Sequence, residues 1–312
     1  MNWKLMMCLP ALLAAYINIS AQSCCCASTG SNWSIMPNLE KHVVGARYYY
    51  KTFYSVYPHS LNPELSNSRT EEQLHTMELF GRFNIAKRLQ LSIFLPVNII
   101  SQTDRKGDSR SAGLGDMSFM LQYGLLDPLR CNGKTSKHQL RLGAGVKLPS
   151  GQFSMTAANM FATSLQLGTG SVDFLFNGIY TYRFKQFGFN LTAAYRLNTA
   201  NPYQYKFGDR VQSGASFFYV IPVKALSIMP QIGINYDHGF FNHSKKEKLS
   251  YTGGDFLTAT AGLDIYYKSI AFTTAFTPAL VNRLNWSGEL RQKYFFEVGV
   301  FYNFQTKKPL TK

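Results

Sequence analysis

Beyond its first residues, this chain has no apolar run long enough to form a membrane-spanning helix. Such a helix needs roughly 20 consecutive apolar residues, and no stretch after residue 23 approaches that length. The opening run, residues 5–19, is apolar but short; it follows Lys4 and precedes the small residues Ala21 and Ser23. This arrangement is typical of a secretory signal peptide. We therefore expect residues 1–23 to be a signal peptide and the rest of the chain to be exported.

Acidic residues are also scarce. The chain has 17 Asp and Glu residues against 32 Lys and Arg residues, which gives a formal net charge of +15. A basic excess often indicates a nucleic-acid partner. Here the basic residues are dispersed rather than clustered, and export separates the chain from nucleic acid inside the cell. We therefore expect no nucleic-acid partner.

The sequence lacks the common motifs of enzymes. It has no Gly-x-Ser-x-Gly and no phosphate-binding loop, and no cluster of Ser and His falls on one face of adjacent segments. The pairs Gly113/Gly115 and Gly168/Gly170 lack the third glycine and the following helix of a dinucleotide fingerprint. We therefore expect neither catalysis nor a cofactor.

Cysteine is rare and unevenly distributed. The five cysteines are Cys8, within the expected signal peptide, then Cys24, Cys25, Cys26 and Cys131. An exported chain can hold disulfides, and adjacent cysteines are poorly placed to bridge one another, so a bridge from the triplet to Cys131 is the simplest interpretation. The triplet could instead bind a soft metal ion such as Cu(I) or Zn(II), although zinc ligands are usually spaced apart. The third alternative is that the thiols do neither.

What the chain does have is sustained alternation of apolar and polar residues. Hydrophobic residues make up 46% of the chain and aromatic residues 15%. Met77 and Leu79 share one face of a predicted strand, whereas Arg82 and Asn84 share the other. A period of two that is sustained this long predicts strands rather than helices. The alternating segments are 43–55, 72–85, 89–101, 115–126, 138–149, 170–183, 187–198, 208–221, 226–238, 254–267, 270–281 and 291–304.

The connections between these segments alternate between long and short. The short ones are residues 86–88, 184–186, 222–225 and 268–269, and only 127–137 is longer than expected for its position. Membrane barrels show this alternation because their periplasmic turns are tight and their external loops are not. The long connections are residues 56–71, 102–114, 150–169, 199–207, 239–253 and 282–290.

We therefore predict an all-β fold, a transmembrane antiparallel up-and-down barrel of about 12 strands in the outer membrane of a Gram-negative bacterium. An even number of strands places both termini on the periplasmic side. The expected domains are a cysteine-containing periplasmic segment at 24–42, the barrel at 43–304 and a tail at 305–312. Lipid is one expected partner. Five prolines would remove ladder hydrogen bonds, so some strands should bulge or end at one of Pro96, Pro149, Pro222, Pro230 and Pro278.

The last segment carries a second feature of such barrels. Glu297, Gly299, Tyr302 and Phe304 place a polar residue, a glycine and two aromatic residues at fixed offsets. This spacing resembles the C-terminal signal by which outer-membrane barrels are handed to their insertion machinery, which is a second expected partner. The same spacing also occurs in ordinary amphipathic strands.

Short glycine-rich motifs in the middle of the chain resemble a known family. They occur in the order Leu114-Gly115-Asp116-Met117, Gly145-Val146-Lys147-Leu148-Pro149-Ser150-Gly151, Leu167-Gly168-Thr169-Gly170-Ser171-Val172-Asp173, Tyr195-Arg196-Leu197-Asn198 and Phe207-Gly208-Asp209. As an ordered set they resemble the outer-membrane barrels named for the MetA pathway of phenol degradation. The resemblance covers roughly residues 110–304 and implies transport of small molecules, with aromatic or apolar compounds among them.

The polar faces of the predicted strands supply candidates for a lumen lining. Basic candidates outnumber acidic ones, which would favour anions in an open pore, whereas mutually satisfied ion pairs would fill the lumen and conduct little. The function expected first is therefore a passive channel or transporter for small molecules. The alternative is a non-conducting structural or binding barrel whose cysteine-rich N-terminus engages a periplasmic partner or a soft metal. The candidates are Arg47, Glu78, Arg82, Asp116, Arg141, Lys147, Asp173, Arg196, Arg210 and Glu297, with Lys51, Asp237, Arg291 and Lys293 on the same faces.

Overall fold

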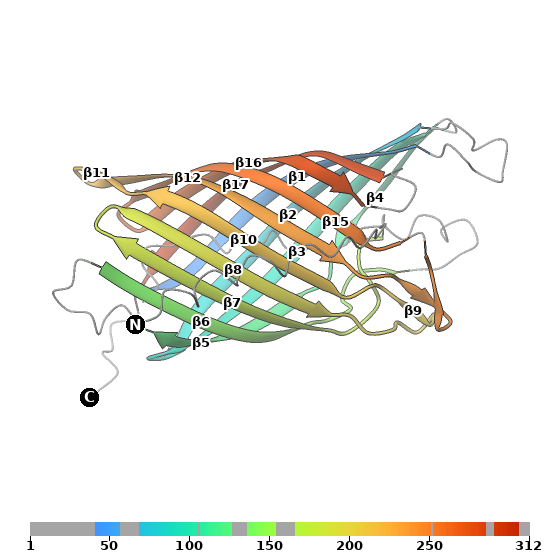
Figure 1. Cartoon of the computed structure of the whole chain (residues 1–312), viewed down its shortest axis with the longest axis horizontal. Coiled ribbons are helices and arrows are strands. Elements are labelled where there is room, and N and C mark those ends of the chain that lie inside the picture. The colour runs from blue at the N-terminus through green and yellow to red at the C-terminus, as the bar shows by residue number, and fades with distance from the viewer. Residues whose placement is uncertain are drawn as a thin grey trace, which may run out of the picture.

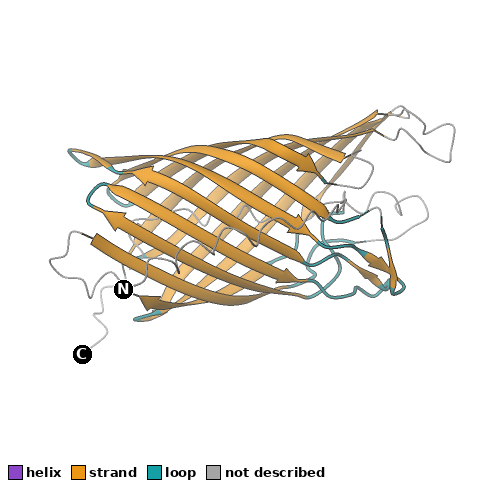
Figure 2. Ribbon diagram, in the orientation of Figure 1, coloured by secondary structure: helices purple, strands orange, loops and turns teal. Residues whose placement is uncertain are grey.

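The computed structural model describes residues 41–56, 69–104, 107–126, 136–153, 166–250, 252–284 and 290–305. Nearly all of the regular structure in these ranges is β-strand (Figure 2). Within the same ranges, no helix has the length and hydropathy needed to cross a membrane. The expected signal peptide, the cysteine segment except Lys41 and His42, Cys131 and all of the expected tail except Gln305 lie outside the described residues.

The described residues form seventeen strands (Figure 1). They are β1 (His42–Val56), β2 (Arg69–Ala86), β3 (Leu89–Asp104), β4 (Gly107–Leu114), β5 (Ser118–Leu126), β6 (Ser136–Lys147), β7 (Asp173–Phe184), β8 (Phe187–Leu197), β9 (Tyr205–Lys206), β10 (Arg210–Tyr219), β11 (Ile221–Val223), β12 (Leu226–Gly239), β13 (His243–Ser244), β14 (Glu247–Lys248), β15 (Gly254–Tyr267), β16 (Ile270–Arg283) and β17 (Leu290–Phe304).

Twelve of these strands close into a barrel. Each long strand pairs antiparallel with its neighbours in the chain, from β1 through β2, β3, β5, β6, β7, β8, β10, β12, β15 and β16 to β17. β17 pairs with β1 from His42↔Phe304 to Ser55↔Leu290, which closes the ring and leaves no free edge. The strands run obliquely to the long axis of the molecule (Figure 1). The predicted barrel, with its even strand number, is confirmed.

The strands extend further than the alternation predicted at one end of the barrel. The region 102–114 was expected to be a loop, but β3 continues to Asp104 and β4 pairs with it from Asp104↔Gly107 to Val97↔Leu114. The expectation of a loop is therefore wrong. Every residue of β4 except Gly113 is exposed, so neither face of this strand needs to be apolar, and its sequence shows no alternation. Three very short strands, β9, β13 and β14, form a separate sheet within two other long connections.

Two prolines mark irregular points in the ladders. Pro96 lies where β3 changes partner: its pairing with β5 ends at Phe94↔Ser118, and its pairing with β4 begins at Val97. Pro278 lies where the pairing of β16 with β15 becomes irregular and its pairing with β17 ends. Both positions agree with the loss of a backbone donor at proline.

The tight turns gather at one end of the barrel, where β1 begins and β17 ends (Figure 1). Three of them, between β7 and β8, β11 and β12, and β15 and β16, begin with Lys185, Lys224 and Lys268 at φ values of 52°, 52° and 53°. A positive φ is uncommon for residues other than glycine. The two-residue length of these turns requires it, and the lysine side chains remain free to project outward.

The barrel is apolar outside and polar inside. Large apolar side chains are exposed on the outer surface, for example Phe217 at 60% and Ile232 at 65%. Many polar and charged side chains are almost completely buried, including Glu78 at 1% and Lys147 at 1%. Because the wall is a single sheet, a buried side chain on it faces the enclosed lumen. The alternation in the sequence therefore corresponds to an outer apolar face and an inner polar face.

Candidate functional site: the barrel lumen

All but two of the candidates predicted from the polar strand faces lie on the inner face of the barrel. Arg82, Arg141, Arg196 and Arg210 are half-buried. The others are buried to at least nine-tenths of their surface: Arg47, Glu78, Asp116, Lys147, Asp173, Glu297, Lys51 and Asp237. The charged side chains of the lumen lie where they can contact one another between strands, and the contacts form the groups described next.

Arg47 on β1 is the centre of one group. Its Nε donates to Glu78 Oε1 at 3.1 Å, and a second nitrogen forms a close ion pair with the same carboxylate. Glu297 on β17 lies 4.0 Å from the guanidinium, and the Tyr49 hydroxyl donates to Glu78 at 3.2 Å. The Arg47 guanidinium also lies over the Phe80 ring, 4.7 Å from its centroid. One cation therefore joins β17, β1 and β2 across the inner wall.

Lys147, at the end of β6, is the centre of a second group. Its Nζ lies 2.7 Å from Asp116 Oδ2 and 2.6 Å from Asp173 Oδ2, and it donates to the Thr169 hydroxyl. Asp116 also accepts from the backbone amides of Thr169 at 2.8 Å and Gly151 at 3.1 Å. The group holds the segments after β6 and before β7 against the start of β5. A buried lysine with two carboxylates and a full set of donors is a structural anchor rather than a free charge.

This second group explains the motifs that suggested a family. Asp116, Lys147 and the segment 167–173, which are far apart in sequence, meet in one network. The network extends to the residue that directly follows the fourth motif, because the Thr199 amide donates to Asp173 Oδ1 at 3.0 Å. It reaches the fifth as well, because the Asn198 amide donates to Asp209 Oδ1 at 2.9 Å. The ordered glycine-rich motifs are thus the parts of a single folded junction.

A third charged pair lies between β10 and β12. Arg210 donates to Asp237 Oδ1 at 2.6 and 3.1 Å from two nitrogens, and Gln212 Nε2 donates to Asp237 Oδ2 at 2.5 Å. The geometry of the pair resembles that of Arg47 and Glu78.

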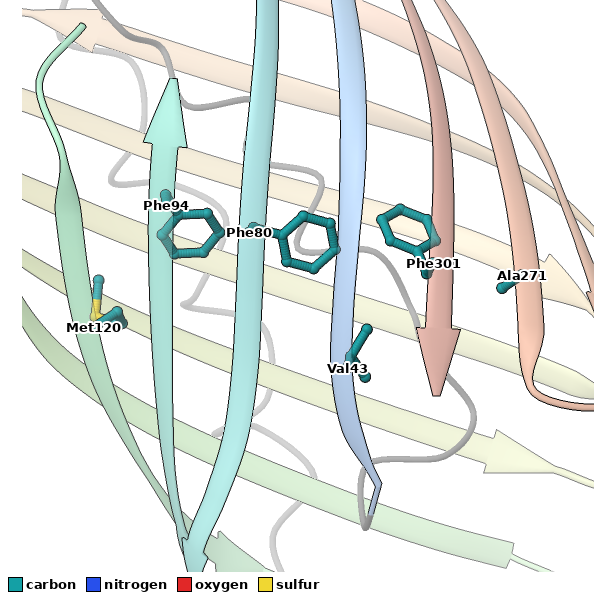
Figure 3. Packing of buried hydrophobic residues seen from close by; sticks show 6 residues of the cluster. All are labelled: Val43, Phe80, Phe94, Met120, Ala271 and Phe301. Atoms are coloured by element: carbon teal, nitrogen blue, oxygen red, sulfur yellow. The ribbon is translucent and has the colours of Figure 1, made fainter. Parts of the chain in front are cut away.

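A belt of apolar side chains on the inner face was missed by the sequence reasoning. The rings of Phe80 and Phe94 stack at 6.3 Å, and Phe301 meets Phe80 edge-on at 5.0 Å. Figure 3 shows the rings of Phe94 on β3, Phe80 on β2 and Phe301 on β17 in a row, with β1 between the last two strands. Leu175 on β7 and Tyr266 on β15 pack against this belt from its two sides. Alternation did place these positions inward, but the inner face was treated as polar throughout. The buried belt is Val43, Phe80, Phe94, Met120, Ala271 and Phe301.

The wall formed by β8, β10, β12, β15 and β16 has a different chemistry. A Cβ atom at Gly214 would lie 2.8 Å from the Thr192 hydroxyl and 2.5 Å from Asn235 Oδ1, so these two side chains converge over the glycine. Asn235 Nδ2 donates to Thr260 Oγ1 at 3.0 Å, and Thr260 contacts the Thr277 hydroxyl at 3.1 Å. This part of the wall, which lies between the Arg210–Asp237 pair and the buried Phe218, offers small side chains, hydroxyls and amides, and we call it the neutral wall. The inner face therefore carries an aromatic belt and a neutral wall beside the charged groups described above.

Two lumen arginines lack the pairing seen at Arg47 and Arg210. Among the described residues, the Arg82 and Arg196 guanidiniums make no hydrogen bond and no salt bridge. The surroundings of Arg196 include the carboxylates of Asp173 and Asp237. The charged groups around Arg82 are Arg141 and Arg47, which have the same sign.

Two residues assigned to the inner face lie outside it. Arg291 and Lys293 are exposed, and Lys293 Nζ pairs with Glu71 at 3.4 Å. The register of β17 against β1 shifts next to Phe53, so the alternation reverses between Lys293 and Phe295. A one-residue irregularity moves every following side chain to the other face of the strand, which is why parity counted from Phe304 fails here.

The residues of the predicted assembly signal occupy both faces of β17. Tyr302 is exposed on the outer surface, whereas Glu297 is buried in the lumen beside Arg47. Phe304 stacks on His42 at 5.2 Å and on Tyr302 at 6.1 Å, where the last strand meets the first. The described residues contain no cluster of His, Cys, Asp and Glu that could hold a metal ion. The proposed metal and disulfide positions, the Cys24–Cys26 triplet and Cys131, lie outside the described residues.

Of two comparisons of the sequence with known proteins, one gave a match. A family model described as "Putative MetA-pathway of phenol degradation" matches residues 65–224, about half of the chain. A comparison with curated protein sequences gave no match.

Comparison with solved structures shows the same fold in other barrels. The COG4313 outer membrane channel from Pseudomonas putida F1 is similar with a TM-score of 0.62 and 12% identity, over 85% of this chain and 96% of that one. The β domain of the Bordetella autotransporter BrkA has a TM-score of 0.48 and 10% identity, over 84% and 99%. A Pseudomonas aeruginosa FadL homologue has a TM-score of 0.42 and 10% identity, over 94% and 100%. At these identities the similarity shows the fold alone, and the last two are too distant to support more.

Proposed function

Because this chain belongs to the family named for the MetA pathway of phenol degradation and is an outer-membrane β-barrel, we propose that it is a passive channel for small molecules, including aromatic and apolar compounds. The tight-turn end of the barrel faces the periplasm in this proposal. The chain acts by binding and passage, without catalysis. The name of the related P. putida protein, an outer membrane channel, agrees with this role.

The observation that carries the proposal is the apolar belt inside the lumen. The lumen of a barrel that passes only water and ions is polar. Here Phe80, Phe94 and Phe301 are buried on the inner face, each less than a tenth exposed. Aromatic rings contribute large apolar contact area, and here that area forms part of the inner wall. The belt therefore supports an apolar cargo better than a sugar or an inorganic ion.

The paired charges favour a second candidate, the non-conducting barrel. Glu78, Lys147 and Asp173 are each only 1% exposed, so much of the lumen at these levels is filled by protein. In that alternative the barrel supports a periplasmic partner or metal that the cysteine-rich segment binds. The two candidates differ in whether anything passes through the lumen.

Entry of the fluorescent probe 1-N-phenylnaphthylamine into intact Gram-negative cells tests the channel. An intact outer membrane excludes this apolar aromatic compound, so expression of the chain should raise its rate of entry. Hydrolysis of a hydrophilic β-lactam by a periplasmic enzyme should change little in the same cells. If probe entry matches the vector control while heat-modifiable migration shows an inserted barrel, and planar bilayers show no conductance, the non-conducting barrel is correct.

A further inference from the structure

Arg82 is a cation without a counter-ion in the part of the chain that the structure describes. It lies on β2, directly opposite Val43 on β1 and Ser92 on β3, and both of these neighbours are buried on the inner face. Its guanidinium makes no hydrogen bond or salt bridge with a described residue. A charge away from bulk water is costly unless it is paired or hydrogen-bonded. The lumen around Arg82 therefore favours a negative group that the described wall does not supply.

The missing counter-ion at Arg82 is not a general property of the cations in this lumen. Arg47 is paired with Glu78, Arg210 with Asp237, and Lys147 with two aspartates. By contrast, no described carboxylate forms an ion pair with Arg82, and Arg141 is among the cations that act on it.

A second guanidinium is fixed close to this point. Arg141 on β6 donates from NH1 to Gln90 Oε1 at 3.2 Å, and Gln90 Nε2 donates to Asn84 Oδ1 at 2.9 Å. This chain of hydrogen bonds crosses from β6 to β3 and β2, and Asn84 lies one inward position from Arg82. Tyr266 on β15, four strands away around the ring, packs against the apolar belt, which includes Val43 directly opposite Arg82. The polar contacts available to a ligand come from several strands at once.

The apolar belt begins at the next inward position. Phe80 precedes Arg82 by two residues on the same face of β2, and its ring stacks with that of Phe94 on β3. Met120 on β5 lies directly opposite Ser92, which itself lies opposite Arg82. A molecule that reaches Arg82 therefore also contacts aromatic and apolar surface. Arginine is well suited to bind carboxylates because its planar fork of donors matches the two oxygens.

We propose that Arg82, together with Arg141, forms a binding site in the lumen for a small organic acid. The carboxylate of the ligand supplies the counter-ion of Arg82, and its apolar body lies along Phe80 and Phe94. The inference rests on the proposed function, since it takes the lumen as the path of the cargo. It narrows the cargo from apolar compounds in general to those that combine an apolar body with a carboxylate.

Isothermal titration calorimetry on the full chain in detergent tests the site with three probes: benzoate, benzyl alcohol and acetate. Benzoate should bind about tenfold or more tightly than either of the others, because it alone has both the carboxylate and the ring. Arg82→Gln should weaken benzoate binding about tenfold and leave benzyl alcohol unchanged. Arg82→Lys should retain part of the affinity, since it keeps the charge but not the fork.

Arg110→Gln is the matched control, because Arg110 is an exposed arginine on β4 and its loss removes the same charge far from the site. It should leave benzoate binding unchanged. The site is wrong if benzoate binds no better than benzyl alcohol, if acetate binds as well as benzoate, or if Arg82→Gln binds benzoate normally in a barrel with unaltered heat-modifiable migration. Binding in detergent does not require passage. Benzoate binding without entry of the apolar probe into cells would therefore overturn the channel and keep the site, whereas entry without a preference for benzoate would overturn the site alone.

Discussion

Arg47 and Glu78 show how single residues keep charge inside this barrel. The two side chains are 6% and 2% exposed, and Phe80 and Tyr49 complete their surroundings. Lys293 and Glu71 also pair a cation with a carboxylate. This pair lies on the outer surface, where the two side chains are 37% and 43% exposed. The Coulomb attraction of the first pair is little screened by water, and the desolvation of each partner is costly. The two pairs therefore differ greatly in what happens when one partner is removed.

We expect Glu78→Gln to destabilise the barrel by about 3–5 kcal/mol, because it leaves Arg47 buried with less compensation. Lys293→Gln, the matched control, should cost about 0–1 kcal/mol. Urea titration followed by the change in electrophoretic migration between folded and unfolded barrel measures both. The double variant Arg47→Met/Glu78→Leu should recover much of the loss. Equal destabilisation by Glu78→Gln and Lys293→Gln would contradict the role of burial.

At the scale of secondary-structure elements, Lys147 couples three strands at the end opposite the tight turns. It ends β6, and its two carboxylate partners precede β5 and begin β7. Lys147→Met would leave two buried aspartates facing one another without a cation. We expect segments 148–153 and 166–172 to detach from the inner wall, since their anchor is lost, while the twelve-strand ladder remains.

Limited proteolysis of intact cells and single-channel recording check this expectation for Lys147→Met. Cleavage by an added protease should become faster, and the conductance of the inserted barrel should rise. Lys206→Met is the control, because Lys206 pairs with Asp209 only three residues away and is about one-third exposed. If Lys147→Met shows the conductance and protease resistance of the unmodified chain, the network is not what holds these segments.

The last strand carries the proposed assembly signal, and its end is tied to the first strand. Phe304 lies opposite His42 and stacks on it. Phe304→Asp should abolish insertion, because it removes the terminal aromatic group that we propose the insertion machinery reads, whereas Phe304→Leu should insert in part. Heat-modifiable migration of membrane fractions measures insertion. Normal migration of Phe304→Asp would show that the end of β17 is not read in this way.

At the scale of the whole molecule, the ring of twelve strands could be predicted because the outer face must be apolar at every second residue. A strand that needs no apolar face was not predicted. β4 is exposed on both faces, so its sequence, Gly107 to Leu114, carries no alternation. Lys293 was misplaced because a local shift in register leaves no mark on the period of two.

The candidate site could be predicted only in part, for a related reason. The alternation of residues along each strand identified the inward positions of Arg47, Glu78 and Lys147. Which charged side chains form ion pairs, however, is decided by the pairing between strands. Phe80 and Phe301 stand at inward positions too, and the pattern alone gave no reason to expect aromatic side chains there. The placement of the aromatic belt and the neutral wall on different parts of the inner face depends on closure of the ring, which brings together strands that are distant in sequence.

This placement predicts opposite effects of substitutions in the aromatic belt and in the neutral wall. Phe80→Ser/Phe94→Ser replaces aromatic surface by hydroxyls, so entry of 1-N-phenylnaphthylamine should fall on the order of tenfold, and entry of a hydrophilic β-lactam should rise. Thr192→Val/Thr260→Val removes hydroxyls from the neutral wall with little change of volume. It should leave entry of the apolar probe unchanged or faster and should slow the hydrophilic compound. A uniform change in both rates for either variant would mean that pore width, and not the chemistry of each wall, governs passage.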